Sequence, residues 1–372
     1  MNAHGAALLD WLACAYGGRE QRAARVTRAA GDGLLERVAW LGTAGHVLDF
    51  DDTYLPGIAH LSAPTAPAAI AVAAEVGLSV GHVLDAHAAG FEAMGRLSRA
   101  HRLYEGGWHP TAVCGAAGAA RAAALLLELD EERAGAAERL ALLQAGGLRA
   151  AFGSDGKSLQ VGMAAAAGVQ AARIAAGGAV ISAGVLEAPD GFAAAFGAAQ
   201  ESDAGAAVEQ NWIKPWPCCL MSHSAIEAAT RADLGGGAPI EVAVHPVARR
   251  AAAYDEVADG LQAKFSIPYL VAYVALRGEP EPASFDGVDP EVQAVARTRV
   301  RVVTDDALRE AEAVIAVGRE EVARVPAARG SPERPMSADE LAAKCALLAG
   351  DRLDGLLGDR DAPAQALLDA LA

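Results

Sequence analysis

The sequence has few aromatic residues and no run of basic residues, and both absences restrict what it can be. Aromatic residues make up 5% of the 372 residues, whereas hydrophobic residues make up 53%. We therefore expect an ordered chain whose core is built from small side chains between closely packed helices. The net charge is −16 without any Lys/Arg-rich segment, so a nucleic-acid-binding face is not expected. Any Lys or His that binds an anion must stand out locally against this acidic background.

Cysteines and long apolar runs are also scarce. The spacing of the cysteines fits neither a disulfide framework nor a zinc site. Their odd number, together with an N-terminus that lacks a secretory signal, predicts a cytoplasmic protein. The uncharged stretch 174–186 is too short to span a bilayer, so no membrane association is expected. The cysteines are Cys14, Cys114, Cys218, Cys219 and Cys345.

Helical periodicity dominates the first half of the chain. Apolar residues recur three and four positions apart, and Gly or Pro marks the ends of the segments. Alternation with period two is nearly absent there. The spacing predicts helices over 7–15, 32–48, 66–76, 83–104, 111–129, 131–151 and 163–176.

The pattern changes after Asn211. The prolines of the segment 214–217 (KPWP) exclude a continuous helix. Alternating apolar and polar residues then predict strands over 240–247 and 297–303. A weaker strand is predicted over 311–317, and helices are predicted over 222–232 and 268–276.

Helix signals return near the end of the chain. Ser337 followed by Glu340 has the spacing of a capping box and predicts an amphipathic helix over 338–348. A helical tail after an α+β segment suggests that the C-terminus packs back on the first domain. We therefore predict a mainly α protein in which residues 1–212 and 327–372 form a large all-helical domain. Residues 213–326 form a smaller α+β domain that is inserted before the C-terminal helices.

The segment 46–53 (HVLDFDDT) places three carboxylates and a hydroxyl at the end of an apolar helix. Asp49 and Thr53 are four residues apart and would share a helix face with His46 if the helix continued. Acidic groups at a helix C-terminus oppose the helix dipole, which points to a function. A solvated helix end is the simpler explanation. His60 follows in a Pro/Gly-marked loop, where a histidine is usually just exposed to solvent.

Three further residues have a local context that suits the binding of an anion. His109 precedes Pro110 and lies near the N-cap of a helix, where backbone N–H groups favour an anion and the imidazole tends to be neutral. Lys157 is flanked by glycines and could reach a carboxylate, although its spacing is not that of a P-loop. Lys214 precedes a rigid Pro segment. The alternatives are a capping histidine and ordinary surface lysines.

Together these segments resemble the MmgE/PrpD family, which includes 2-methylcitrate dehydratases, cis-aconitate decarboxylases and an iminodisuccinate epimerase. The resemblance extends from Leu8 to Lys344, in the family's order. It implies an all-helical domain, an α+β lid domain and a homodimer, without a metal or a cofactor. The matching segments are LLDWLACAYGG, HVLDFDDT with His60 and Pro64 downstream, GWHPTAVCGAAGAA, GLRAAFGSDGK, LEAPDGFAAAF, KPWPCC with His223, KFSIPY and SPERPMSADELAAK.

The resemblance also implies an active-site cleft between the two domains. In it Lys157 and Lys214 would bind the carboxylates of a small di- or tricarboxylate, and Thr53 would hydrogen-bond to one of them. The catalytic residues implied are His60, His109, Asp49 and Tyr269, with the two histidines transferring protons.

The reaction expected from the resemblance is that of a lyase, and dehydration is slightly favoured over decarboxylation. Two alternatives remain: an epimerase that acts by proton transfer next to a carboxylate, and a catalytically silent ligand-binding protein. The chain departs from the family pattern in a shorter lid. Gln160 also stands where many members have His, and Leu61-Ser62 replaces the usual Pro-Gly. The shorter lid and Gln160 concern the choice of substrate, whereas Leu61-Ser62 concerns the match at His60.

Overall fold

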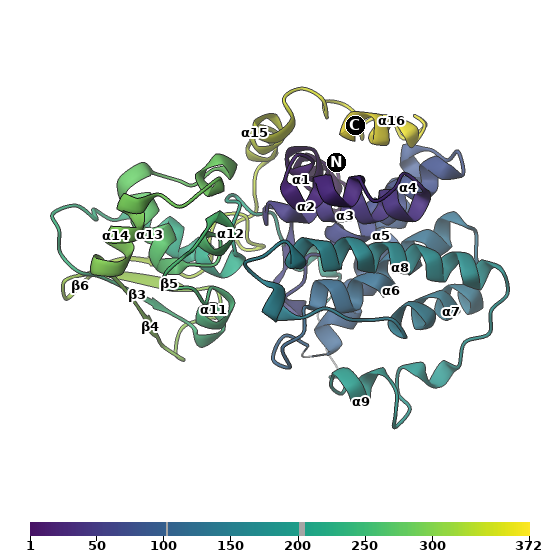
Figure 1. The fold of residues 1–372 in the computed structure, drawn as a ribbon, viewed down its shortest axis with the longest axis horizontal. Helices are drawn as coiled ribbons and strands as arrows, with labels where there is room; N and C mark the ends of the chain where they lie inside the picture. The colour runs from purple at the N-terminus through teal and green to yellow at the C-terminus, as the bar shows by residue number, and fades with distance from the viewer. Residues whose placement is uncertain (102, 201–204) are drawn as a thin grey trace. The chain divides into compact units, whose positions relative to one another are not determined.

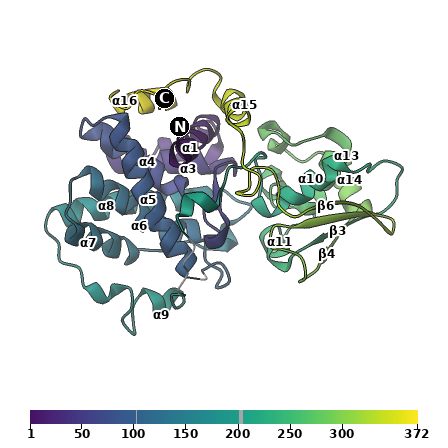
Figure 2. The same cartoon turned by 180° about the vertical axis from the view of Figure 1, so that it is seen from behind.

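The computed structural model describes residues 1–101, 103–200 and 205–372, and the chain divides into two compact units (Figures 1 and 2). The helical unit comprises Met1–Ile213 and Ser337–Ala372, and the mixed unit comprises Lys214–Met336. The chain thus leaves the helical unit once and returns to it for its last 36 residues, which span Ser337–Ala372. Among the described residues, no helix has both the length and the apolar character needed to cross a membrane.

The helical unit is a set of packed helices in which α6 is the most completely buried. It packs against α4, α5, α7 and α8, and α8 also packs against α3 and α7 (Figure 1). A short antiparallel pair, β1 (Thr53–Tyr54) and β2 (Asn211–Trp212), joins distant parts of the chain. The helices are α1 (Ala3–Gly18), α2 (Arg22–Arg28), α3 (Leu34–Val47), α4 (Ser62–Glu75), α5 (Val80–Ala100), α6 (Pro110–Leu126), α7 (Glu131–Leu142), α8 (Gly156–Ala176), α9 (Phe192–Phe196), α15 (Ala338–Ala349) and α16 (Gln365–Leu371).

Two glycines allow α8 to approach its neighbours closely. A Cβ atom on Gly162 would lie 2.2 Å from the Ala39 carbonyl oxygen of α3, and one on Gly168 would lie 2.3 Å from the Ala116 carbonyl oxygen of α6. Neither position could therefore accept a side chain without separating the helices. The small-residue core expected from the sequence thus fixes α8 against both α3 and α6.

The C-terminal helices belong to the core of the helical unit. Helix α15 packs on α1, and α16 packs on α4 and α1. Leu367 and Leu371 of α16 are buried, with at most 1% of their surface exposed. The expected capping box is present, since Ser337 and Glu340 exchange hydrogen bonds at the start of α15.

The mixed unit contains a four-stranded sheet with the order β4-β3-β5-β6. Strand β3 pairs with β4 in parallel and with β5 antiparallel, and β5 pairs with β6 antiparallel. Helix α10 packs on β5 and β6, and α13 packs on α10, α14 and β4. The elements are α10 (His223–Arg231), β3 (Ile240–Val244), α11 (Pro246–Ala251), α12 (Gly260–Ala263), α13 (Ile267–Arg277), α14 (Pro290–Arg299), β4 (Val300–Thr304), β5 (Ala313–Val317) and β6 (Glu320–Val325).

The mainly α character predicted from the sequence is confirmed, but several boundaries differ. The helix predicted over 131–151 is wrong beyond Leu142, because Gly146 and Gly147 follow and Gly147 adopts a left-handed conformation. The strand predicted over 297–303 is wrong at its start, since α14 continues to Arg299. The alternation of apolar and polar residues did not predict β6, whose residues are largely exposed.

Candidate active site

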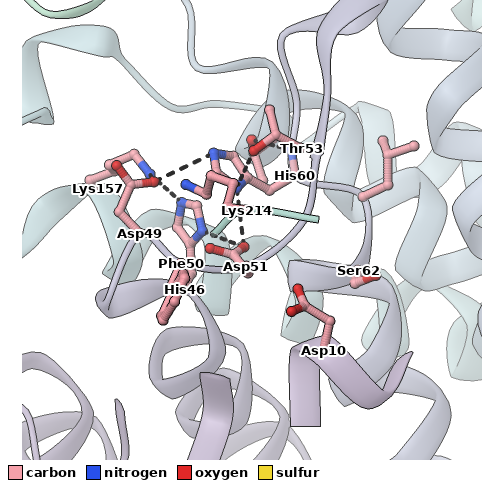
Figure 3. Close-up of polar contacts among 12 residues, drawn as sticks. Asp10, His46, Asp49, Phe50, Asp51, Thr53, His60, Ser62, Lys157 and Lys214 are labelled. Carbon is pink, nitrogen blue, oxygen red and sulfur yellow. Dashed lines mark hydrogen bonds and ion pairs between the residues drawn. The ribbon is translucent and has the colours of Figure 1, made fainter. Parts of the chain in front are cut away.

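A buried cluster of imidazoles, carboxylates and one ammonium lies in the helical unit (Figure 3). It brings together side chains from five places: the end of α3, the following loop, β1, the turn before α4, and the first turn of α8. All of the members are buried, so their polar atoms depend on each other for hydrogen bonds. The members are His46, Asp49, Asp51, Thr53, His60 and Lys157.

The loop after α3 positions the two carboxylates. Helix α3 ends at Val47, and Asp49 follows with a φ of 53°, a left-handed conformation that Asp tolerates better than most residues. Thr53 then lies in β1, paired with Trp212. The expectation that Asp49 and Thr53 share a helix face is therefore wrong. The chain reversal after α3, and not a helical repeat, brings both side chains near the ring of His60.

Asp51 is the centre of the cluster. Its Oδ2 lies 2.9 Å from Nδ1 of His46 and 3.2 Å from Nδ1 of His60. Burial alone would raise the pKa of Asp51, but His46 and then His60 hold it well below its ordinary value. The carboxylate is therefore ionised and can only accept, so both Nδ1 atoms donate to it.

Lys157 joins the other side of His46 to Asp49. Its Nζ lies 2.8 Å from Nε2 of His46 and 3.2 Å from Oδ1 of Asp49. The Lys157 side chain is 8% exposed and that of Asp49 is 4% exposed, so their attraction is only weakly screened by water. His46 thus accepts from Lys157 at Nε2 and donates to Asp51 at Nδ1, which orients its ring at both nitrogens.

The two ring nitrogens of His60 have different surroundings: Nδ1 contacts Asp51, whereas Nε2 lies beyond hydrogen-bond distance from Asp49. Nδ1 contacts Asp51 and lies 3.4 Å from the Thr53 hydroxyl, whereas Nε2 lies 3.8 Å from Oδ1 of Asp49. The backbone N–H of His60 donates to the Thr111 hydroxyl at 3.1 Å. Burial lowers the pKa of His60 to about 3, although the negative charge of Asp51 acts in the opposite direction. The imidazole is therefore neutral at pH 7, with an unprotonated Nε2.

His109 is the N-cap of α6, as the sequence predicted, with Pro110 in the first turn. Its ring stacks on that of His46 with centroids 5.8 Å apart and contacts the Phe152 ring edge to face at 5.0 Å. Burial first, and then Lys157, hold the pKa of His109 well below its ordinary value. His109 is therefore neutral as well, and Nδ1 lies 2.6 Å from the amide nitrogen of Gln160.

A second layer of buried charge supports the loop between Asp49 and Asp51. Nζ of Lys344, from α15, donates to the Phe50 carbonyl at 2.7 Å and lies 2.5 Å from Oδ1 of Asp10. Burial, together with Asp51 and Asp10, raises the pKa of Asp52 well above its ordinary value. The pKa values of the neighbouring residues Asp51 and Asp52 are thus shifted in opposite directions.

Lys214 and Tyr269 belong to the mixed unit. Nζ of Lys214 is fully buried and donates to the Cys218 carbonyl at 3.1 Å, within the KPWPCC segment. The hydroxyl of Tyr269, on α13, accepts from the backbone N–H of Asp289 at 2.9 Å. Both residues are held in defined positions within their own unit, and their role at the site stays a prediction.

Five of the seven residues expected from the sequence lie in the helical unit. Four of these five form the cluster, and the ring of His109 stacks on that of His46. His46 and Asp51 were seen in the motif but were not chosen as site residues. The sequence does show a carboxylate, Asp51, between two histidines, His46 and His60. The contact of Asp51 with both histidines could not be predicted, because helical periodicity does not indicate the chain reversal at Asp49.

His46, Asp51 and His60 also have the spacing of a metal site, since one ligand-type atom of each lies within 4.8 Å of the others. Imidazole and carboxylate suit several transition metals. Here both Nδ1 atoms already contact the Asp51 carboxylate, and the Lys157 ammonium lies 2.8 Å from His46. A divalent cation would have to displace these contacts beside a positive charge, so the geometry favours a hydrogen-bonded cluster.

Comparison with known proteins identifies the family. Residues 38–204 match the MmgE/PrpD N-terminal domain, and residues 216–369 match the MmgE/PrpD C-terminal domain. The chain belongs to the MmgE/PrpD family. It is 30% identical to cis-aconitate decarboxylase of Homo sapiens over 205 residues, which are 50% of this chain and 42% of that protein. The match thus spans less than half of that relative.

The two family domains and the two structural units of this MmgE/PrpD protein divide the chain differently. The C-terminal family domain extends to residue 369 and therefore includes α15 and α16. In the structure both helices belong to the helical unit with α1 and α4. The site cluster lies within the N-terminal family domain, but Lys344, which holds its loop, comes from the C-terminal one.

Proposed function

We propose that this MmgE/PrpD protein is a lyase that acts on a small di- or tricarboxylate without a metal or an organic cofactor. The observation that carries the proposal is the buried cluster, in which a neutral imidazole with an unprotonated nitrogen, His60, lies beside an ammonium, Lys157. A base and a cation in one buried site suit the removal of a proton next to a carboxylate.

His60 is the base in this proposal. Its Nδ1–H donates to Asp51, so Nε2 carries the lone pair that accepts a substrate proton. Asp51 then stabilises the imidazolium that forms, as a buried carboxylate does when it is hydrogen-bonded to a histidine. In the free protein burial keeps the pKa of His60 at about 3. The negative charges of a bound carboxylate substrate raise the affinity of this imidazole for a proton.

Lys157, Thr53 and Lys214 are the carboxylate-binding residues in this proposal. Lys157 lies in the first turn of α8 and contacts Asp49 and His46, so its charge is fixed at the cluster. Such a fixed cation stabilises negative charge that develops on the substrate when the proton leaves. Lys214 would supply a second cation from the mixed unit, which suits a substrate with more than one carboxylate.

The experiment is to incubate the protein with citrate, 2-methylcitrate, cis-aconitate and iminodisuccinate in deuterium oxide, with and without a chelator, and to follow proton NMR spectra. New alkene signals indicate dehydration, and release of carbon dioxide indicates decarboxylation. Either result with the chelator present supports the proposal. Deuterium incorporation without net change would indicate an epimerase instead, and loss of activity in chelator would contradict metal independence.

A matched pair of variants ties the activity to the cluster. His60→Gln removes the base and should lower kcat by about 10²-fold or more, because general bases contribute on that scale. His82→Gln, at an exposed histidine in the first turn of α5, should retain turnover. Full activity in the His60 variant would contradict the assignment of the site. No reaction of the wild type with any of the four acids would contradict the proposed substrate range.

A further inference from the structure

The amide of Gln160 makes three polar contacts, and two of them fix which way it points. Its oxygen accepts from the Leu148 backbone N–H at 3.0 Å, and its nitrogen donates to the Leu148 carbonyl at 3.3 Å. The same nitrogen lies 2.6 Å from Nδ1 of His109. Turning the amide over would place its oxygen against the Leu148 carbonyl and its NH₂ group against the Leu148 N–H, so both backbone bonds would be lost.

The local backbone is shaped around this amide. Trp108 and Leu148 form an antiparallel bridge, and the N–H of His109 donates to the Gly147 carbonyl at 3.0 Å. Gly147 has a φ of 127°, and a Cβ atom there would lie 2.6 Å from that of Ala112 and 3.2 Å from the amide oxygen of Gln160. A glycine at this position therefore leaves the space that Gln160 occupies.

The fixed amide determines where His109 carries its proton. The amide nitrogen can only donate, so Nδ1 of His109 must accept and cannot carry a hydrogen. A neutral His109 therefore has its hydrogen on Nε2. His60 is held the opposite way, because the ionised Asp51 requires a hydrogen on its Nδ1 and leaves Nε2 free. The two histidines of one site thus have opposite tautomers.

We propose that Gln160 is a positioning residue that holds His109 as a hydrogen-bond donor at Nε2, so that His60 alone acts as the base. His60 Nε2 accepts the substrate proton, and the electron pair of the broken C–H bond moves toward the neighbouring carboxylate. His109 donates a hydrogen bond to the oxygen that gains charge and keeps its own proton. In dehydration, His60 returns its proton to the departing hydroxyl group, so protons and charge balance.

The position of His109 supports a donor role. It is the N-cap residue of α6. The positive charge of Lys157 lies close enough to disfavour protonation of the His109 ring. A neutral imidazole at a helix N-terminus can polarise a carbonyl or carboxylate oxygen without becoming an imidazolium. The catalytic part of this inference rests on the proposed function, whereas the tautomer assignment does not.

The first test reads the tautomer directly, without a substrate. Selective ¹⁵N labelling of the nine histidines and long-range proton–nitrogen NMR spectra distinguish ring nitrogens that carry a hydrogen from those that do not. The His109 signals are assigned by their loss in His109→Asn. We expect a hydrogen on Nε2 of His109 and on Nδ1 of His60. A hydrogen on Nδ1 of His109 would overturn the inference, whatever the activity of the protein.

The second test changes the tautomer by one substitution. A carboxylate only accepts, so Gln160→Glu should move the hydrogen of His109 to Nδ1 and lower kcat by about 10²-fold, with KM changed far less. Gln144 and Gln160 both line a surface groove of about 610 Å³. Gln144 is exposed, so Gln144→Glu adds the same charge to this groove and serves as the control. The control should retain both the tautomer and kcat.

The outcomes of the two tests separate this inference from the proposed function. A moved hydrogen with an unchanged kcat would overturn the catalytic role of the tautomer. A decrease of kcat in both Glu variants would show that charge in the groove, and not the His109 tautomer, is responsible. If none of the four acids reacts, the proposed function fails, and the tautomer assignment is still decided by the NMR spectrum alone.

Discussion

At the scale of single residues, the site depends on charges that burial keeps in defined states. Asp51 is ionised because two imidazoles face it and lower its pKa, whereas burial and two carboxylates raise the pKa of the neighbouring Asp52. The histidines beside Asp51 are neutral because burial outweighs its attraction. Proton transfer in such a site starts from known protonation states, and that is why the tautomers can be assigned from hydrogen bonds.

His87 shows the same effect away from the site, and it predicts how stability depends on pH. Its Nε2 lies 3.1 Å from the Ser62 hydroxyl, and burial lowers its pKa to about 3. The unfolded chain takes up this proton near pH 6.5, whereas the folded protein does so only near pH 3. The stabilisation from the neutral histidine is therefore complete above pH 6.5 and decreases as the pH falls toward 3.

Replacement of His87 should reduce this dependence. In His87→Leu, the unfolding free energy should change less steeply with pH between pH 6 and pH 4. The slope should be smaller by about 1.4 kcal/mol per pH unit, which corresponds to one proton. Urea unfolding at several pH values measures this slope. Val83→Ala, a buried change on the same helix, should lower stability without changing the slope. Equal slopes in wild type and His87→Leu would refute the prediction.

At the scale of elements, the loop between α3 and β1 is held by a side chain from the other end of the sequence. Lys344 of α15 donates to the Phe50 carbonyl and lies over the Phe50 ring at 3.9 Å. Phe50 lies between Asp49 and Asp51, so this contact positions both carboxylates of the cluster. The residues of the site thus depend on where α15 packs against α1.

Removal of Lys344 should therefore affect stability and activity together. Lys344→Met removes the ammonium that contacts the buried carboxylate of Asp10 and should cost about 3–5 kcal/mol in unfolding free energy. It should also lower kcat, because the loop loses its support. The double variant Asp10→Asn with Lys344→Met should regain part of the stability, since both buried charges are then removed. A double variant no more stable than the single one would contradict this account.

The sequence predicted elements best where one strong local signal defines an end. Ser337 and Glu340 predicted the start of α15, and Pro110 predicted that of α6, because a cap or a proline acts over one turn. The end of α7 at Leu142 was missed, because apolar residues continue at helical spacing beyond it. The reversal at Asp49 was missed for a related reason, since Asp adopts a left-handed conformation only where tertiary contacts hold it.

At the scale of the whole molecule, the helical unit is completed by the last part of the chain. Its core includes Leu367 and Leu371, whereas the mixed unit ends at Met336. The mainly α composition was visible in the sequence, because helical periodicity is local. The contacts of α15 with α1 could not be derived from periodicity, because it carries no information about partners that are distant in sequence.

Truncation after Met336 should therefore damage the two units unequally. The helical unit loses the contacts of α15 and α16 and should lose amide protection in α1, α3 and α4. The strands β3 to β6 of the mixed unit should keep their protection, since none of their pairing partners is removed. Hydrogen exchange measured by mass spectrometry on both chains tests this. Equal loss of protection in both units would show that the protein unfolds as one cooperative unit.

The bond from Lys344 to the Phe50 carbonyl spans 294 residues, and this separation has a consequence for the newly made chain. At about 5–20 residues per second, the ribosome needs roughly 15–60 s between these two residues. During that interval Asp49 and Asp51 have already emerged, but the lysine that holds their loop has not yet been synthesised. A polypeptide that stalls before Lys344 therefore lacks the lysine that holds this loop, so Asp49 and Asp51 gain this support only after Lys344 has been synthesised.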